Sequence, residues 1–416
     1  MKILIYSLVF PPDGVSTAQL LGEISQDLAA EFEVEVVTTR PHYNVDTGAS
    51  ERQPIVWKWH RLYGTSTLGP VKVTHLNMPG KAPGSAARIL QWTWFHAGSL
   101  LLGLRKEADV ALTVSPPPTV ALVCAALRKL GGPPFLFCVW ELYPDILIPL
   151  GKVKADGKPF ALLKRLERLT YRAADHVAFL HQGMLDQATA TYQPLAAKSS
   201  VIPTFADTNE LIPQPRATAL RASLELSDEH FVVGYAGNIG AAQSLDILIE
   251  AAGRLSGDQK IAFIIAGDGH DRERLQQMVA SSGLENVHFT GHLPYSEVPE
   301  IYATFDLSVV ALGPSVAAEA LPSKVYRTMA CGRPVLAIAD DASPLARFVT
   351  DNAAGFTVSP KDPSEVAKMI AELASDLVRT EAAGATGREV VVSQFSRSAV
   401  TQKIRGVLQT LSGQAA

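Results

Sequence analysis

The sequence EALPSKVYRTMACGRPV, residues 319–335, lies between two short apolar runs, LSVVAL before it and PVLAI at its end. Pro322 and Ser323 predict a helix N-terminus, because proline tolerates the first helical position and serine caps free N–H groups. Lys324 falls in the first turn, where the helix dipole favours acids over bases. A cation beside free N–H groups is expected where an anion docks. The segment therefore predicts either an anion site or an ordinary amphipathic helix with one unfavourable lysine.

Short apolar runs alternate with helix-like stretches along the whole chain. The runs lie at 2–9, 34–39, 109–114, 135–140 and 176–180, and again at 231–236, 261–266, 287–290, 307–311, 334–338 and 355–358. This alternation predicts parallel sheets wrapped by helices. We expect the first helix to start with a capping box of Ser16 and Gln19. The Pro-rich stretch at 203–215 is a linker candidate, so two doubly wound domains with a ligand cleft between them are predicted.

The composition is that of a globular protein with more than one core. The chain has 416 residues, of which 47% are hydrophobic and 19% charged. Three cysteines, Cys124, Cys138 and Cys331, lie in apolar surroundings without metal-ligand spacing, so we expect reduced core thiols and a cytosolic protein. No stretch of about 20 residues is uniformly apolar, so no transmembrane helix is expected.

Positive charge gathers in the first half of the chain. Residues 52–106 contain no acid but eight Lys and Arg and four Trp, and a second basic run spans 152–172. We expect these two segments to form one face against an anionic membrane, with tryptophans at the lipid interface. The alternative is a solvated basic surface with buried aromatics. Nucleic acid is not an expected partner, because the second half of the chain is acidic.

Two loops that follow predicted strands of the first half carry candidate residues. FPPDG ends at Gly14, which allows close backbone approach, although a simple turn is equally consistent. WELYPD places Glu141 and Asp145 among aromatic residues. Two carboxylates there suggest a site at the strand ends, and the alternative is one exposed acid and one helix cap.

Two glycine-rich loops follow the first strands of the second half. One contains Asn238 and Gly240, and the other contains Gly267 and Gly269. Such turns can bind phosphate through backbone N–H groups, although the second loop also fits a plain β-turn. The dinucleotide fingerprint, the P-loop and the nucleophile elbow are all absent from the sequence.

In this order and spacing, the segments resemble the retaining glycosyltransferases of family 4, and most closely the WbuB-like transferases of bacterial surface-polysaccharide pathways. The resemblance implies an α/β GT-B fold of two Rossmann-like, doubly wound domains that face a central cleft. Residues 1–205 would bind the acceptor and residues 206–394 the nucleotide sugar. A final helix at about 395–416 would cross back onto the first domain.

The family signature is a pair of glutamates eight positions apart. Its first position is Glu319, which the resemblance assigns to the donor sugar, and its second is Arg327. Arginine has only donors, so it cannot bind ribose hydroxyls as glutamate does, but it can contact a phosphate. Lys324 would neutralise the diphosphate, with Ser323 and Val325 beside it. The nucleotide base would lie near Gly267, Gly269 and Leu293.

In the reaction that the resemblance implies, the acceptor hydroxyl attacks from the side of the leaving group, and a phosphate oxygen accepts its proton. No protein nucleophile, metal or cofactor is required. Glu319 and Lys324 would act on the donor. Glu141 would orient the acceptor or act as a base, with Asp145 as the fallback.

The expected activity is transfer of an N-acetylated hexosamine or deoxyhexosamine, such as N-acetyl-fucosamine, from a UDP-sugar. The expected acceptor is a polyprenyl-diphosphate-linked saccharide at the inner face of the plasma membrane, in O-antigen or capsule synthesis. Two alternatives remain open: a UDP-sugar 2-epimerase of the same architecture, and a non-catalytic protein that binds sugar nucleotides.

Overall fold

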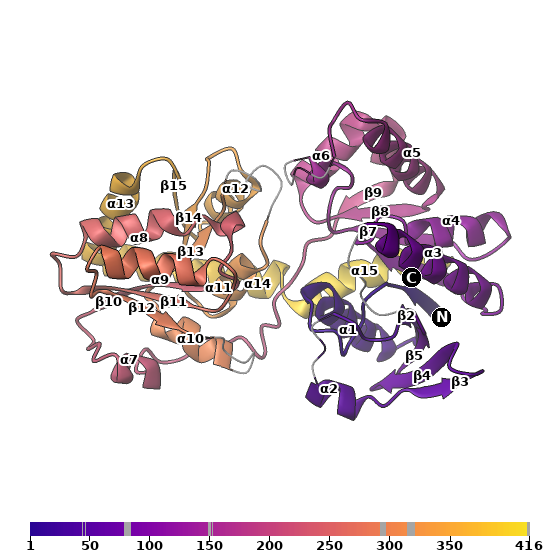
Figure 1. The fold of residues 1–416 in the computed structure, drawn as a ribbon, viewed down its shortest axis with the longest axis horizontal. Coiled ribbons are helices and arrows are strands. Elements are labelled where there is room, and N and C mark those ends of the chain that lie inside the picture. Colours follow the sequence, from indigo (N-terminus) through magenta and orange to yellow (C-terminus); the bar gives the residue numbers. More distant parts are fainter. Residues whose placement is uncertain are drawn as a thin grey trace. The chain divides into compact units, whose positions relative to one another are not determined.

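The computed structural model describes residues 1–43, 45, 47–78, 85–148, 151, 153–291, 297–313 and 321–413 (Figure 1). The chain divides into two compact units. Unit 1 comprises residues 1–203 and 400–416, and unit 2 comprises residues 204–399. Each unit contains one sheet with helices packed against it.

The sheet of unit 1 has the strand order β3-β4-β5-β2-β1-β6-β7-β8-β9 within the described residues. Seven strands run parallel: β1 (Lys2–Tyr6), β2 (Glu33–Thr39), β5 (Val71–Leu76), β6 (Val110–Val114), β7 (Phe135–Val139), β8 (His176–Phe179) and β9 (Ser199–Val201). Beside β5, the sheet is extended by two antiparallel strands, β3 (Val56–Lys58) and β4 (Tyr63–Leu68). Strands β3, β4, β5 and β9 were not predicted from the sequence.

The helices of unit 1 are α1 (Ser16–Ala29), α2 (Thr47–Arg52), α3 (Ser85–Gly103), α4 (Ala121–Lys129), α5 (Lys158–Ala173) and α6 (Gln182–Thr191). The capping box predicted for the first helix is wrong. Ser16 is already helical, and the N-cap position is Val15, whose side chain has no atom that can accept a hydrogen bond.

Helix α15 (Arg397–Leu411) contributes its residues from Val400 onward to unit 1. The Thr401 hydroxyl donates a hydrogen bond to Asp27 over 3.1 Å, and Arg405 forms an ion pair with Glu31 at 2.7 Å. Val400, Ile404 and Leu408 are buried. Polar and apolar contacts therefore fix this helix to unit 1 near the end of α1.

Unit 2 has a six-stranded parallel sheet in the order β12-β11-β10-β13-β14-β15. Its strands are β10 (Phe231–Ala236), β11 (Ile261–Ala266), β12 (Val287–Thr290), β13 (Leu307–Ala311), β14 (Val335–Ile338) and β15 (Gly355–Val358). They confirm the six apolar runs predicted from the sequence. The helices are α7 (Ala219–Ser223), α8 (Asp246–Arg254), α9 (Arg272–Ser281), α10 (Val298–Thr304), α11 (Lys324–Ala330), α12 (Pro344–Asp351), α13 (Pro363–Ser375) and α14 (Leu377–Gln394).

Both faces of the unit 2 sheet are buried. Along β10, Val233 and Tyr235 belong to one apolar cluster, while Val232 belongs to another. Because successive side chains of a strand point to opposite faces, the two clusters lie on opposite sides of the sheet. The strand order reverses between β10 and β13, which is where open α/β sheets bind ligands.

The predicted linker at 203–215 is instead a packed part of unit 2 from residue 204 onward. The Arg388 guanidinium donates to the carbonyls of Thr208 and Leu211 at 3.0 and 2.9 Å. Asp207 forms an ion pair with Arg397 at 3.2 Å. The stretch looked loose in sequence because long-range side chains, rather than its own pattern, hold it in place.

The three cysteines are buried free thiols, as predicted. Among the described residues, no helix has both the length and the apolar content that crossing a bilayer requires.

Candidate functional site

The two glycine-rich loops of unit 2 pack backbone against backbone at the carboxyl ends of β10 and β11. A Cβ atom on Gly267 would lie 1.9 Å from the carbonyl oxygen of Gly237, and one on Gly269 would lie 2.0 Å from that of Ile239. The N–H of Ile239 donates to the carbonyl of Asp268 over 2.8 Å. No side chain fits at either glycine, so the two predicted loops form one joined surface of main-chain groups.

The loop after β10 is stabilised by its own amide side chains. The Gln243 side-chain oxygen accepts a hydrogen bond from the Gly240 N–H at 3.1 Å, and Asn238 donates to the same oxygen at 3.5 Å. The Tyr235 hydroxyl donates to the Asn238 carbonyl at 2.5 Å. The loop thus keeps its shape without a charged side chain of its own.

Lys324 lies directly over this loop. Its ammonium donates to the Tyr235 hydroxyl and lies 4.2 Å from the centre of the Tyr235 ring. A Cβ on Gly237 would lie 2.3 Å from the Lys324 Cε, so glycine is required for the lysine to take this position. The structure therefore brings together the lysine and the glycine loop that the sequence analysis singled out separately.

Burial, together with the smaller effect of the positive charge of Arg327, lowers the pKa of Lys324 to about 7. Arg327 follows one turn later on α11. Two cations so close together are held at an electrostatic cost, which a bound dianion would relieve. Burial also raises the pKa of Tyr235, so its hydroxyl stays protonated and can donate to Asn238 while accepting from Lys324.

The helix start at Lys324 is as predicted, but the predicted serine cap is wrong. Ser323 occupies the N-cap position with helical backbone angles, φ −59° and ψ −17°, and its side chain makes no capping bond. A capping serine normally has an extended backbone, which directs its hydroxyl back to the helix N–H groups. Val325 is fully buried in the core, so its side chain is not available to a ligand. Glu319 and Leu293 lie outside the described residues.

A hollow of about 420 Å³ opens at the carboxyl ends of β13 and β14, where Gln243, Leu312 and Asp340 line it. The N–H of Gly313 donates to the Ala242 carbonyl over 2.8 Å. This bond joins the loop after β13 to the loop after β10 across the point where the strand order reverses.

In unit 1, Glu141 follows β7 and is held by the end of β6. The Ser115 hydroxyl oxygen accepts hydrogen bonds from the N–H groups of Trp140 and Glu141, at 3.0 and 3.3 Å. Burial raises the pKa of the Glu141 carboxyl, and a hydrogen bond with Tyr143 partly opposes that rise. A half-buried carboxyl with a raised pKa suits proton transfer or a hydrogen bond to a hydroxyl.

Asp145 has a different environment. Its carboxylate forms an ion pair with Lys164 at 2.5 Å, and Lys164 also contacts Glu167 at 2.9 Å. The Tyr171 hydroxyl donates to the other Glu167 oxygen at 3.1 Å. This cluster anchors the loop on α5, so the Asp145 carboxylate is already paired in a way that Glu141 is not.

Gly14 is exposed, and its N–H donates to the Tyr43 carbonyl over 3.0 Å. The buried neighbour Asp13 accepts from the N–H groups of His42 and Tyr43, both at 2.7 Å. Burial raises the pKa of Asp13. Asp13 was not among the predicted site residues. Its signal was an acid inside a Pro-Gly turn, and its role is to join the loops after β1 and β2.

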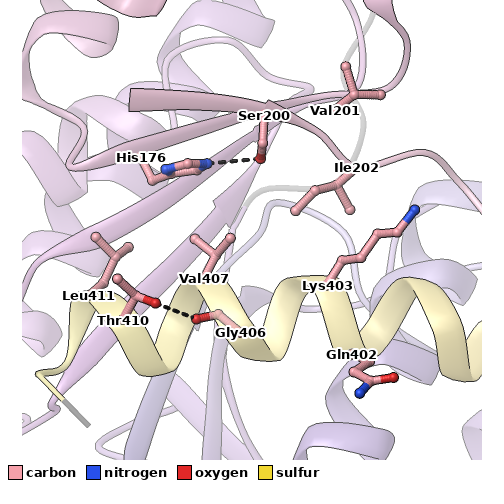
Figure 2. Close-up of a pocket in the computed structure, with 10 residues that line it drawn as sticks. All are labelled: His176, Ser200, Val201, Ile202, Gln402, Lys403, Gly406, Val407, Thr410 and Leu411. Carbon is pink, nitrogen blue, oxygen red and sulfur yellow. Dashed lines mark hydrogen bonds between the residues drawn. The ribbon is translucent and has the colours of Figure 1, made fainter. Parts of the chain in front are cut away.

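Unit 1 contains another hollow, of about 400 Å³, between β9 and α15 (Figure 2). His176 and Ser200 are hydrogen-bonded at 2.9 Å on the strand side, while Val407 and Leu411 line the helix side. None of the predicted site residues is among the described residues that line it.

Two family models match the chain in succession. The model described as a glycosyl transferase 4-like domain matches residues 17–204, and the model described as glycosyl transferases group 1 matches residues 217–390. Together they span most of both units.

Curated relatives align over most of their own length. WcaI of Escherichia coli K12, assigned as a glycosyl transferase of colanic acid biosynthesis, is 28% identical over 80% of this chain and 82% of the relative. WbjE of Pseudomonas aeruginosa, assigned as a glycosyltransferase, is 25% identical over 74% of this chain and 76% of the relative.

Solved structures agree on the fold. Anabaena HepE in complex with UDP matches with a TM-score of 0.71 and 19% identity, over 99% of this chain and all of that one. WaaG, a glycosyltransferase involved in lipopolysaccharide biosynthesis, matches with a TM-score of 0.70 and 14% identity, over 98% of this chain and 99% of that one. With a transferase model over each unit and the same fold in known transferases, the chain belongs to the family 4 glycosyltransferases and is a glycosyltransferase enzyme of the GT-B fold.

Proposed function

We propose that the protein is a retaining transferase that moves a sugar from a UDP-sugar to a polyprenyl-diphosphate-linked saccharide in bacterial surface-polysaccharide synthesis. The sugar we propose is an N-acetylated hexosamine or deoxyhexosamine such as N-acetyl-fucosamine. The observation that carries the proposal is the position of Lys324 over Gly237, beside joined loops of main-chain groups. The name of WcaI supports a polysaccharide product, and the HepE complexes with UDP and UDP-glucose support a uridine nucleotide.

The charges of unit 2 fit a departing diphosphate. Breaking the bond between sugar and phosphate leaves growing negative charge on the diphosphate, and cations fixed in advance stabilise that charge without reorganising. In this proposal Lys324 and Arg327 provide the cations, and the reaction uses no metal. Glu319 contacts the donor sugar, and the main chain around Gly267 and Gly269 holds the nucleotide.

Glu141 is the carboxyl that we assign to the acceptor hydroxyl. Its pKa is raised by burial, whereas Asp145 is paired with Lys164. Because a phosphate oxygen of the donor takes the hydroxyl proton in this reaction, Glu141 orients the acceptor rather than accepting that proton.

We also propose that the enzyme works in the cytoplasm at the inner face of the plasma membrane, with residues 52–106 and 152–172 against anionic lipid. Trp59 is 71% exposed and Trp94 is 51% exposed, whereas Trp57 and Trp92 are half-buried. Helix α5 exposes Leu162 and Leu169 together with arginines. Exposed apolar residues beside cations are what peripheral membrane binding requires.

A panel of UDP-sugars tests the proposal. The true donor should raise the unfolding temperature and be hydrolysed slowly without acceptor, because a ligand that binds only the folded state stabilises it. Glu319→Ala should abolish transfer with little change in stability. Formation of the C2 epimer from UDP-GlcNAc alone would favour the epimerase instead. If no UDP-sugar shifts the unfolding temperature, the proposed donor class is wrong.

A further inference from the structure

A third hollow, of about 420 Å³, lies at the carboxyl edge of the unit 1 sheet. It is lined by Arg40, Asn77, Met78, Leu90 and Trp94, and we call it the Arg40 hollow. Arg40 directly follows β2, and Asn77 and Met78 directly follow the neighbouring parallel strand β5. Its volume falls within the range of about 300–1,000 Å³ that is typical of small-molecule sites.

The Arg40 hollow adjoins the loop that contains Gly14, one of the candidate binding residues predicted from the sequence. Two residues after Arg40, the N–H of His42 donates to Asp13 over 2.7 Å, and Asp13 precedes Gly14. Ligands of open α/β sheets bind at this edge.

Arg40 is a cation without a counter-ion in the described part of the chain. Its guanidinium is half-buried, and no described residue forms an ion pair or a side-chain hydrogen bond with it. Two other basic residues near the same sheet are paired, Lys72 with Glu33 and Lys106 with Glu35. Arginine binds phosphate in a bidentate manner, so this guanidinium is suited to an incoming phosphate.

The part of the hollow that α3 contributes is apolar, and a hydrogen bond holds its tryptophan in place. Leu90 is 68% exposed and Trp94 is 51% exposed. The Trp94 indole N–H donates to the Asn77 carbonyl over 3.1 Å, which holds the ring across the strand end. Large apolar side chains that are exposed and oriented in this way mark a contact surface for a partner.

The apolar wall continues along α3. Leu101 and Leu104, the latter one residue beyond the end of α3, are exposed as well. At 3.6 residues per turn, positions 90, 94, 101 and 104 fall on the same side of the helix. The face begins at the cation and runs away from it for roughly 20 Å, at about 1.5 Å per residue. It therefore matches a molecule with an anionic head and a long apolar tail.

We propose that the Arg40 hollow binds the junction between the phosphate and the isoprenoid chain of the lipid-linked acceptor. Arg40 takes the phosphate, and Leu90, Trp94 and the exposed face of α3 take the chain. The assignment rests on the proposed function in one respect, namely that the acceptor is carried on a polyprenyl diphosphate.

Farnesyl diphosphate is the probe, titrated into the full chain by calorimetry with UDP present to block the donor site. It should bind, while farnesol and pyrophosphate should bind much more weakly.

Arg40→Gln should weaken binding by about tenfold or more, as expected for loss of a charge-assisted pair. Arg105→Gln removes an equally positive, exposed residue just beyond α3 and should change affinity less than twofold. Trp94→Ala should weaken binding, and Trp59→Ala should not.

The unfolding temperature of Arg40→Gln should match that of the parent, because no described side chain depends on the guanidinium. Equal losses from Arg40→Gln and Arg105→Gln would overturn the proposal in favour of general attraction between charges. Competition by phosphatidylglycerol vesicles as effective as that by polyprenyl phosphate vesicles would overturn the assignment to an isoprenoid. Binding of UDP-sugars is measured separately. If no UDP-sugar binds but farnesyl diphosphate still does, the proposed function is wrong, while the assignment of the Arg40 hollow to the phosphate and the isoprenoid chain stands.

Discussion

At the donor site that we propose, the ionisation of Lys324 should couple binding to pH. In the folded protein its pKa is about 7, against about 10.4 in an unfolded chain. The folded protein therefore binds fewer protons than the unfolded chain between these values, so this group raises stability as pH rises through that window. A bound diphosphate has the opposite preference and favours the charged lysine, so donor binding should take up a proton above pH 7.

We predict that UDP affinity falls as pH rises above 7, by up to about tenfold per pH unit, because one proton is bound with the ligand. Calorimetry in two buffers of different ionisation enthalpy would measure the proton uptake. Lys324→Met should bind more weakly and lose this slope. The variant also tests whether the pH dependence comes from the lysine rather than from His270, whose ring lies near Gly240. A constant affinity from pH 6.5 to 8.5 in the parent would contradict the assignment.

The residues around Lys324 were only partly predictable. The lysine and both glycine loops were visible as local patterns in the sequence. Tyr235 was not, because it reads as one more apolar residue of a buried strand, and its bond to Lys324 joins positions 89 residues apart. The failed cap at Ser323 has a similar origin, since tertiary packing sets its backbone angles. Local patterns predict which groups are present, while the contacts that tune them depend on the fold.

At the level of elements, the joined glycine loops are the most constrained part of unit 2. We predict that Gly267→Ala lowers the free energy of unfolding by about 1–3 kcal/mol or more, because φ is +137° and the new Cβ would meet the Gly237 carbonyl. UDP binding should fall as well. Gly257→Ala is the matched control, since open space surrounds a Cβ there. Urea unfolding measures both variants, and equal effects would contradict this account of the loops.

The strands differed in how well the sequence predicted them. All six strands of unit 2 were found, because a parallel sheet buried on both faces requires continuous apolar runs. Strands β3 and β4 were missed, because they form an antiparallel extension at the edge of their sheet and carry many polar or exposed residues. This hairpin lies within residues 52–106, the acid-free interval that was predicted from its composition to be a basic face.

For the whole molecule, we predict salt-sensitive sedimentation with vesicles that contain anionic lipid, since cations near headgroups are screened by salt. Leu162→Glu with Leu169→Glu should reduce the bound fraction severalfold, because both exposed leucines lie among the arginines of α5. Val378→Glu, at an exposed valine of unit 2, is the control. Absence of binding by the parent at low salt would count against a membrane-associated enzyme.

Helix α15 has a consequence for how the protein is made. It packs in unit 1 against the end of α1, yet residues 204–399 must be synthesised before it. At about 5–20 residues per second, that interval lasts roughly 10–40 s. During this interval the nascent unit 1 lacks α15, so the apolar surface that Ile404 and Leu408 later cover stays exposed. Unit 2 is continuous in the chain, whereas unit 1 cannot be completed until α15 has been made.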